Sequence, residues 1–359
     1  MLVAKMNDMK PILSVIIPVY NVKEYLDDCL RTIIAQTLQD IEIILVDDGS
    51  SDGSSEICDG FAAKDCRIKV VHQENQGAGM ARNAGLEIAT GEYVTFVDGD
   101  DCLDVTAFGY MIDVIKANDL DALRISYNKF KDGGNLTNSN STSHVDIYTE
   151  KEDIRLIQMS LFSRPYNKSI RDINLGGAPW GIVIKADIIK NNNIRFMSER
   201  EIISEDYIFN YECLNYINRI GKSYKTLYHY RITPNSITRS PKLDNITRTI
   251  TTCELMTKLF LRDGFDVVSK YYAMGYCIDV LRVHLKNVFV SSMQVKNKLE
   301  WAKQQSKLSY FKSVYDEYPW KRLKLKHRIG FYLFVKGHIK WLYFMIVGQE
   351  ILRGNLKLK

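Results

Sequence analysis

A chain of 359 residues is long enough for two compact units, or for one unit with a sizeable appendage. Its composition, 46% hydrophobic and 25% charged, excludes a disordered chain and a collagen-like fibre. Seven cysteines without any C-x-x-C pair argue against a zinc site or a disulfide scaffold, and they favour reduced thiols in a cytosol. The start of the chain lacks the pattern of a signal peptide, and no segment has about 20 consecutive apolar residues, so we expect a protein that does not cross a membrane.

The net charge of +5 is distributed unevenly along the chain. Residues 319–359 contain ten Lys or Arg and one acid, a net charge of +9. The other 318 residues carry 38 basic and 42 acidic side chains, a net charge of −4. This asymmetry indicates that the C-terminal segment meets an anionic surface, and it argues against a body that binds nucleic acid.

Strands and helices are predicted to alternate in the first third of the chain. Short apolar runs rich in β-branched residues predict strands at residues 12–17, 41–46, 68–71 and 93–97. Apolar residues at helical spacing, together with cap residues, predict helices at residues 22–35, 54–63 and 77–89. The first strand is expected to stop at Pro18. The alternation predicts an α/β fold with a mainly parallel sheet, whose ligands bind beyond the carboxyl ends of the strands.

The middle of the chain is less regular, and the pattern turns helical later. Residues 131–146 are polar and rich in turn formers, which predicts an exposed loop. Residues 162–196 contain the adjacent Gly176 and Gly177 together with Pro179, and we expect them to be partly mobile. From residue 245 to 315, apolar residues recur at helical spacing and predict a helical region.

Acidic side chains gather in two predicted loops, each at the carboxyl end of a strand. Asp47 and Asp48 follow the second strand, and Asp98 and Asp100 follow the fourth strand, with Gly99 between them. Carboxylates that face one crevice repel each other unless a cation or a ligand rich in donors lies between them. Mg²⁺ is typically bound by few carboxylates together with substrate phosphates. The two clusters together therefore predict a divalent metal site, although either cluster alone would fit a solvated turn equally well.

A glycine motif raises the alternative of a dinucleotide site. Gly77 and Gly79 begin a sequence like G-x-G-x-x-G, and a strand that ends at Asp98 follows about 20 residues later. Arg82 stands in the place of the third glycine, where a long side chain blocks close packing of the helix on the strand. We therefore disfavour a hydride-transferring enzyme. Arg82 is either a fixed cation suited to a diphosphate or an exposed arginine of a helix.

Four motifs in this region resemble successive signatures of glycosyltransferase family 2. They are PVYN at 18–21, VDDGSSD at 46–52, ARNAG at 81–85 and FVDGDD at 96–101. Their order and spacing are similar to those of the family from about residue 12 to 103. The resemblance implies the GT-A fold, a Rossmann-like arrangement with helices flanking the sheet, and an inverting enzyme of the hexosyltransferase type.

The resemblance also implies a donor site and a metal site. Tyr20 would stack on the nucleotide base, and Asp48 would hydrogen-bond to it. Asp98 and Asp100 would be the D-x-D pair that holds Mn²⁺ or Mg²⁺ on the diphosphate. The residues assigned in this way to the nucleotide sugar are Pro18, Val19, Tyr20, Asp47, Asp48, Arg82, Asp98 and Gly99.

A later motif supplies a candidate catalytic base. Glu205 and Asp206 open a predicted helix with Ser204 as the N-cap, and the family places its base in such an E-D pair. Carboxylates in a first turn are also what any stable helix favours, because they lie at the positive end of its dipole. After a D-x-D crevice we prefer the catalytic assignment. Asp206 is then the base, kept ionised by the helix N-terminus, and Glu205 orients the acceptor or a neighbouring side chain.

Three further residues are assigned on weaker patterns. Trp180 either stacks on a sugar face, as the resemblance implies, or is a half-buried core residue. Arg231 is a candidate for binding the acceptor or a phosphate. His229 is a candidate for a third metal ligand, or an ordinary residue of a strand rich in tyrosine.

Residues 320–348 interleave Lys and Arg with aromatic residues. Charged residues interrupt this segment, so it cannot span a bilayer. The pattern is typical of a helix that lies in an anionic membrane interface, and also of a basic helix packed on the rest of the protein. We favour the membrane interface, from about residue 319 onward.

These patterns predict a metal-dependent, inverting glycosyltransferase with a GT-A domain at residues 1–240 and a helical extension at 241–359. The nucleotide half of the domain is expected at about 10–130 and the acceptor half at about 131–240. The predicted donor is a UDP-sugar, and the predicted acceptor is a saccharide linked to a polyprenyl diphosphate, in the synthesis of a surface polysaccharide. The predicted location is the cytoplasm, at the inner face of the cell membrane.

Two other functions stay open at this point. A nucleotidyltransferase that makes nucleotide sugars would need a glycine- and arginine-rich phosphate loop where PVYN stands at 18–21. A nucleotide-sugar-binding scaffold without turnover would be expected to lack Asp98, Asp100 or the E-D pair, and all of these are present.

Overall fold

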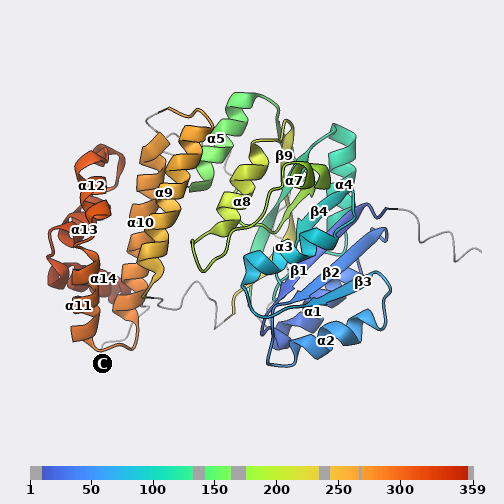
Figure 1. Cartoon of the computed structure of the whole chain (residues 1–359), viewed down its shortest axis with the longest axis horizontal. Coiled ribbons are helices and arrows are strands. Elements are labelled where there is room, and N and C mark those ends of the chain that lie inside the picture. Colours follow the sequence, from blue (N-terminus) through green and yellow to red (C-terminus); the bar gives the residue numbers. More distant parts are fainter. Residues whose placement is uncertain (1–9, 132–141, 163–174, 234–242, 267–268, 355–359) are drawn as a thin grey trace, which may run out of the picture. The chain divides into compact units, whose positions relative to one another are not determined.

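The computed structural model describes residues 10–131, 142–162, 175–233, 243–266 and 269–354 (Figure 1). The described residues form two compact units. The first contains residues 10–161, 175–200 and 204–233, and the second contains Phe162, residues 201–203 and the described residues from 243 onward. The boundary expected near residue 240 lies outside the described residues. Each unit buries its own set of apolar side chains.

Nine strands in the described part of the first unit form one sheet. Its order is β3-β2-β1-β4-β8-β6-β9-β5, and β7 pairs with β9. The four strands expected from the sequence are confirmed as the parallel set β3-β2-β1-β4, and the α/β class is confirmed with them. The strands are β1 (Leu13–Val19), β2 (Ile41–Asp47), β3 (Ile68–His72), β4 (Tyr93–Phe96), β5 (Cys102–Leu103), β6 (Ala122–Phe130), β7 (Val145–Tyr148), β8 (Ile182–Lys185) and β9 (Ile220–Arg231).

Pro18 does not end β1, contrary to the expectation from the sequence. The strand pairs with β2 through Val19, which lies opposite Asp47. The backbone of Ile16 faces β4, because Val97 N–H donates to Ile16 O, and Pro18 faces the same side two residues later. By then β4 has ended at Phe96, so the missing N–H of the proline removes no bond of the ladder.

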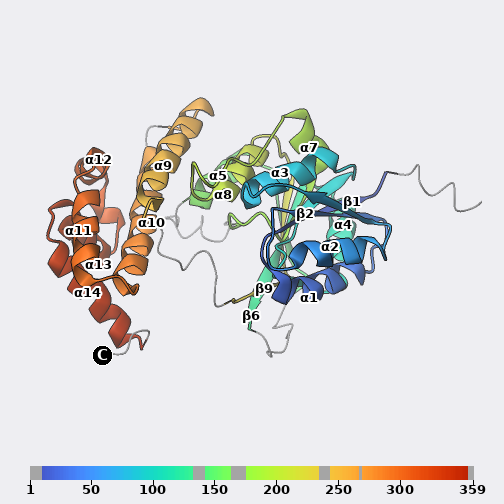
Figure 2. The same ribbon diagram turned by 60° about the horizontal axis from the view of Figure 1, so that its bottom comes forward.

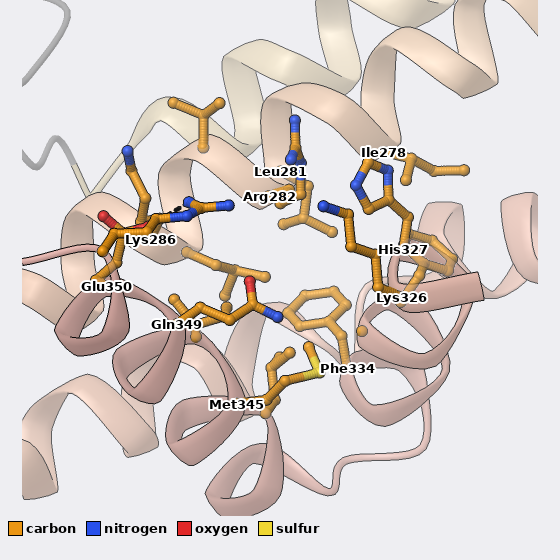
Figure 3. A pocket seen from close by; sticks show the side chains of 17 residues that line it. Ile278, Leu281, Arg282, Lys286, Lys326, His327, Phe334, Met345, Gln349 and Glu350 are labelled. Carbon is orange, nitrogen blue, oxygen red and sulfur yellow. Dashed lines mark hydrogen bonds and ion pairs between the residues drawn. The ribbon is translucent and has the colours of Figure 1, made fainter. Parts of the chain in front are cut away.

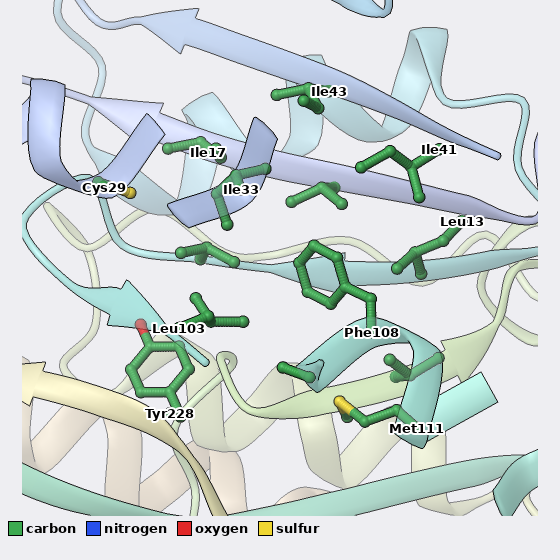
Figure 4. Packing of buried hydrophobic residues seen from close by; sticks show 14 of the residues in the cluster. Leu13, Ile17, Cys29, Ile33, Ile41, Ile43, Leu103, Phe108, Met111 and Tyr228 are labelled. Carbon is green, nitrogen blue, oxygen red and sulfur yellow. The ribbon is translucent and has the colours of Figure 1, made fainter. Parts of the chain in front are cut away.

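Helices cover both faces of the parallel strands, because side chains alternate between the two faces along each strand. Leu13 and Ile17 of β1 belong to one buried cluster with Ile33 of α1 and Phe108 of α4 (Figure 4). Figure 2 shows α1 and α2 on one side of β1 and β2, and α3 on the other. The helices that begin in this unit are α1 (Lys23–Ile34), α2 (Ser54–Ala62), α3 (Ala78–Ile88), α4 (Ala107–Asn118), α5 (Lys151–Phe162), α7 (Ala186–Asn191) and α8 (Glu205–Leu214).

The irregular middle of the chain contributes more to the sheet than its sequence indicated. Residues 163–174 lie outside the described residues, but the described part from 175 to 196 contains β8 and α7. The strand β8 is antiparallel to both β4 and β6, so it lies inside the sheet and not in a mobile loop. Its apolar run, IVIK at 182–185, is too short for periodicity to distinguish a strand from a loop. In the predicted loop at 131–146, residues 132–141 lie outside the described residues and β7 begins at Val145.

The second unit is helical, as predicted. The segment 320–348 contains the 3-10 helix η4 and two α-helices instead of a single helix, and Gly337, with φ of 73°, separates the two α-helices. In the described part of the chain, no helix is long and apolar enough to cross a membrane. The helices of this unit are α9 (Asn245–Arg262), α10 (Lys270–Val290), α11 (Val295–Gln305), α12 (Ser309–Glu317), the 3-10 helix η4 (Trp320–Arg322), α13 (Leu325–Val335) and α14 (Ile339–Leu352).

The contact between α3 and β1 yields a prediction on stability. A Cβ at Gly85 would overlap the Cγ2 atom of the buried Ile16, so Gly85→Ala should lower the free energy of unfolding by about 1–3 kcal/mol. The matched control is Gly60→Ala in α2, where an added Cβ meets nothing within 4 Å. That variant should gain up to about 1 kcal/mol from helix propensity. Urea denaturation measures both, and equal stability of the two variants would contradict the contact.

Candidate active site

The loops that follow β1, β2 and β4 meet at the carboxyl edge of the parallel strands. Asp48 N–H donates to Val19 O over 2.8 Å, which joins the first two loops. A Cβ at Gly99 would lie 3.3 Å from Pro18 O, so the glycine allows the loop after β4 to approach the end of β1. Tyr20 follows β1 and is 48% exposed, which leaves its ring open to a ligand. The structure thus brings the predicted donor residues of three strands to one edge.

Asp48 is buried and holds the loop that leads into α3. Its carboxylate accepts hydrogen bonds from Gln73 Nε2 (2.7 Å), Gln76 N–H (2.8 Å) and Gly77 N–H (2.7 Å). The neighbouring Asp47 is also buried and accepts a hydrogen bond from Ser50 N–H over 3.0 Å. The carboxylates of Asp47 and Asp48 therefore fix the loops at the edge of the site. This role does not depend on any contact with a nucleotide base.

Arg82 lies at the centre of the site. Its guanidinium is buried, with Nη2 2.8 Å from Asp98 Oδ1 and Nη1 3.7 Å from Glu205 Oε1. These two contacts connect the loop after β4 with the first turn of α8, more than 100 residues later in the chain. Arg82 Nε is buried and has no hydrogen-bond partner among the described residues, which leaves one donor for an anionic ligand. Arg82 is therefore not an exposed arginine of a helix.

The D-x-D pair carries negative charge that the protein does not fully compensate. Burial and the nearby Asp98 carboxylate raise the pKa of Asp100 to about 6. Among the described residues, no group of three or more His, Cys, Asp or Glu side chains is arranged to hold a metal ion. Asp98 and Asp100 nevertheless fit a hard divalent cation, because their negative charge is not fully compensated. Such a cation completes its coordination shell with diphosphate oxygens and water.

Arg231 and Asp101 fix the loop that carries the D-x-D pair. Arg231 Nε donates to Asp100 O over 2.8 Å, and Arg231 N–H donates to the buried Asp101 carboxylate over 2.7 Å. The same carboxylate accepts a hydrogen bond from Tyr228 O–H over 2.6 Å. The guanidinium of Arg231 also contacts Asp28 Oδ2 at 3.1 Å. Arg231 thus positions the loop after β4, and its expected role in binding the acceptor or a phosphate stays a prediction.

His229 and Trp180 lie in packed surroundings beside this loop. His229 is buried, and its Nδ1 lies 2.7 Å from Asn128 Oδ1. Burial lowers the pKa of His229. The ring of Trp180 stacks on Tyr228 at 4.3 Å between centroids and packs edge-on against Tyr127 at 4.9 Å. A stacked, half-buried ring suits the core role that the sequence left open for Trp180, and its acceptor role stays a prediction.

Glu205 and Asp206 occupy the first turn of α8, after Ser204 in the left-handed N-cap position with φ of 56°. Burial and the adjacent Glu205 carboxylate raise the pKa of Asp206 to about 8, against the opposing effect of Arg82. The expectation that the helix N-terminus keeps Asp206 ionised is therefore wrong for the protein without ligands, because burial outweighs the helix dipole. A pKa near neutrality suits a group that accepts and releases a proton.

Two residues that build the site were missed from the sequence. Glu199 accepts hydrogen bonds from Ala78 N–H and Gly79 N–H, each 3.0 Å long, at the N-terminus of α3. No motif marks Glu199, because its partners lie about 120 residues away. Arg124 is buried in β6 and donates to the carbonyls of Ala178 and Trp180. The signal in the sequence that could have identified Arg124 is a single arginine within an apolar strand.

The chain is similar to known proteins in sequence and in fold. Residues 14–176 match the family described as "Glycosyl transferase family 2". The chain is 32% identical over 233 residues to the "Uncharacterized glycosyltransferase EpsJ" of Bacillus subtilis, a match that covers 65% of this chain and 64% of the relative. The chain thus spans a little under two thirds of the length of that curated relative. Over residues 14–176 the chain is therefore a member of glycosyltransferase family 2.

Solved structures share the fold. The S. aureus TarS 1-349 structure in complex with UDP-GlcNAc has a TM-score of 0.63 at 20% identity, and the match covers 98% of this chain and 93% of that one. The mannosyltransferase PcManGT from Pyrobaculum calidifontis, in complex with GDP-Man and Mn²⁺, has a TM-score of 0.51 at 14% identity, over 96% of this chain and 88% of that one. The GT-A fold expected from the motifs is confirmed.

The raised pKa of Asp206 predicts a stability effect with a definite sign. The folded protein holds this proton between the unfolded pKa of about 3.9 and the folded pKa of about 8, so the free energy of unfolding falls as the pH rises through that interval. Asn cannot ionise. Asp206→Asn should therefore gain stability relative to the parent by roughly 1–4 kcal/mol between pH 5 and pH 8.

Urea denaturation at the two pH values measures this difference. The matched control is Asp113→Asn, which makes the same substitution at an exposed position of α4. A parallel response of the two variants would show that burial does not perturb Asp206.

Proposed function

We propose that the protein transfers a sugar from a nucleoside diphosphate sugar to a hydroxyl group, with inversion at the anomeric carbon. The observation that carries the proposal is the double ion pair of the buried Arg82 with Asp98 and Glu205. These ion pairs bring the two acidic motifs into one charged site. A reaction between a diphosphate leaving group and an acceptor hydroxyl requires such a site. We propose a UDP-sugar as the donor, in line with the UDP-GlcNAc bound to TarS.

The donor would lie along the carboxyl edge of β1, β2 and β4. The exposed ring of Tyr20 offers a stacking surface for the base, with Asp47 and Asp48 at the edge of the same site. The free Nε donor of Arg82 would hydrogen-bond a diphosphate oxygen. Asp98 and Asp100 would hold Mn²⁺ or Mg²⁺, which supplies positive charge to the departing diphosphate. Mn²⁺ in the PcManGT complex supports the choice of ion.

Asp206 would act as the general base. The acceptor oxygen forms its bond to the anomeric carbon while the bond from that carbon to the diphosphate oxygen breaks, and the hydroxyl proton passes to the Asp206 carboxylate. Such proton transfer typically contributes about 10²–10⁴-fold in rate. Glu205, held toward Arg82, would keep Asp206 and the acceptor oriented. A single displacement inverts the configuration without a covalent sugar–enzyme intermediate.

The acceptor we propose is a saccharide carried on a polyprenyl diphosphate, in the synthesis of a surface polysaccharide at the inner face of the cell membrane. The support comes from the last two helices, α13 and α14, which combine basic residues with large apolar side chains in solvent. Trp341 is 71% exposed and Phe344 is 67% exposed. Side chains of this kind, beside Lys and Arg, favour contact with an anionic membrane interface. No observation favours a nucleotidyltransferase or a scaffold without turnover.

The transfer is tested by incubating the protein with a panel of nucleotide sugars and Mn²⁺ or Mg²⁺, and measuring release of nucleoside diphosphate. Asp206→Asn should retain donor binding within about twofold and lose at least about 10²-fold in turnover, because only the proton acceptor is removed. Asp100→Ala should lose the turnover that depends on the metal.

Asp113→Asn serves again as the control, since it removes an exposed carboxylate of α4 that belongs to neither motif. Its turnover should equal that of the parent. Transfer by Asp206→Asn at the parent rate would sink the assignment of the base.

Membrane association is tested by sedimentation with vesicles that contain anionic lipid. The double variant Trp341→Gln and Phe344→Gln should remain folded, because both side chains are exposed, and should lose most of its sedimentation. The control variant carries Leu261→Gln and Val295→Gln, which replace exposed apolar residues of α9 and α11. If both double variants sediment like the parent, the tail is a packed basic element and not an interface.

A further inference from the structure

The second unit contains a pocket of about 160 Å³ between α10, α13 and α14 (Figure 3). Its lining includes a set of buried or partly buried apolar side chains from all three helices. They are Ile278, Leu281, Leu285, Phe334, Met345 and Ile346. Figure 3 shows Phe334 and Met345 on the side of the pocket formed by α13 and α14. An apolar lining of this kind suits a short length of hydrocarbon.

Basic side chains surround this apolar lining. The charged residues of the pocket are Arg282, Lys286, Lys326, Arg353 and Glu350. Four cations against one carboxylate leave an excess of three positive charges, with His327 taken as neutral. Glu350 is matched by Arg353, whose Nη1 lies 2.7 Å from Glu350 Oε1. The remaining cations are not cancelled within the pocket.

Two of these cations have no partner in the described part of the chain. Neither Lys286 nor Lys326 makes a hydrogen bond or an ion pair there, and Arg282 has only a long contact of 3.4 Å with Asp279. Figure 3 shows Arg282 and Lys326 reaching toward the same end of the pocket. Arg282 adds to the effect of burial in lowering the pKa of His327, and Asp279 opposes it. An anion at this end would gain from Arg282 and Lys326.

The two features together restrict the ligand. Inorganic phosphate would leave the apolar lining unused, and an uncharged hydrocarbon would leave the cations unmatched. Both are used by a phosphate group that is attached to a hydrocarbon chain. The pocket also lies in the helices that expose apolar side chains, since Leu325, Ile329 and Tyr332 lie on one face of α13 at spacings of four and three residues.

We propose that this pocket binds the phosphate headgroup and the adjoining chain of an anionic membrane phospholipid. The proposal rests on the membrane association in the proposed function and adds a specific headgroup site to it. Arg282 and Lys326 hold the phosphate, and Leu281 and Phe334 contact the chain. Two of these residues come from α10, which lies outside the basic tail, so the site belongs to the folded unit.

The test uses short-chain lipids below their micelle concentration and the full chain. Calorimetric titration with dihexanoylphosphatidylglycerol should show binding, and dihexanoylphosphatidylcholine and inorganic phosphate should each bind at least about tenfold more weakly. The variant Arg282→Gln with Lys326→Gln should lose about tenfold or more in affinity for the anionic lipid. The matched control, Lys336→Gln with Lys340→Gln, removes the same charge from exposed positions outside the pocket and should bind within about twofold of the parent.

A steric variant separates the pocket from general charge. Gly330 lines the pocket, and Gly330→Leu keeps every charge while placing a side chain toward Met345. It should lose binding of the short-chain lipid with an unchanged circular dichroism spectrum. Any of three results would overturn the proposal. The two charge variants could lose affinity equally, or inorganic phosphate could bind as tightly as the lipid. The third result is a polyprenyl phosphate that binds more than tenfold tighter than the phospholipid.

An assay of sugar transfer distinguishes a failure of the pocket assignment from a failure of the proposed function. Nucleoside diphosphate release with a soluble acceptor, without vesicles, should be unchanged in the pocket variants. Lipid binding in a protein without transfer would sink the proposed function and leave the pocket assignment standing. Sugar transfer by a protein that does not bind the lipid would overturn the pocket assignment and leave the proposed function standing.

Discussion

One buried guanidinium group holds the proposed active site together. Arg82 extends from α3 and contacts both Asp98, after β4, and Glu205, at the start of α8. Removal of this cation would leave the partly buried carboxylates of Asp98 and Glu205 without their cationic partner, a destabilising change in a protein interior. The same position gives Arg82 access to a diphosphate, so the group that stabilises the site without ligands is also the group that would receive the donor. Structure and proposed function therefore depend on one side chain.

The site carries more negative than positive charge, and this excess explains its acid–base behaviour. Asp100 and Asp206 both have raised pKa values, of about 6 and about 8, and burial is the largest cause in each case. Groups arranged in this way cost stability and are typical of functional sites. A divalent cation at the D-x-D pair would relieve part of the repulsion. We infer that the strain on these carboxylates is part of how the site would select a metal-bound diphosphate.

The sequence predicted the parallel half of the fold and the positions of the acidic motifs, because strand and helix periodicity and short motifs are local signals. It could not predict β8, which is antiparallel and fixed by its neighbours, or the engagement of Arg231 with the loop after β4. The role of Glu199 at the N-terminus of α3 depends on residues about 120 positions away. The direction of the pKa shift of Asp206 was predicted wrongly. A helix N-terminus can be recognised in a sequence, but the extent of burial, which raises this pKa, cannot.

The most direct test of the account is a crystal structure of the protein with UDP and Mn²⁺. We expect the ion between the carboxylates of Asp98 and Asp100 and a diphosphate oxygen within hydrogen-bond distance of Arg82. Asp206 should face the open side of the diphosphate. A nucleotide bound elsewhere, or an Arg82 that stays on Asp98 and Glu205 without touching the diphosphate, would contradict it.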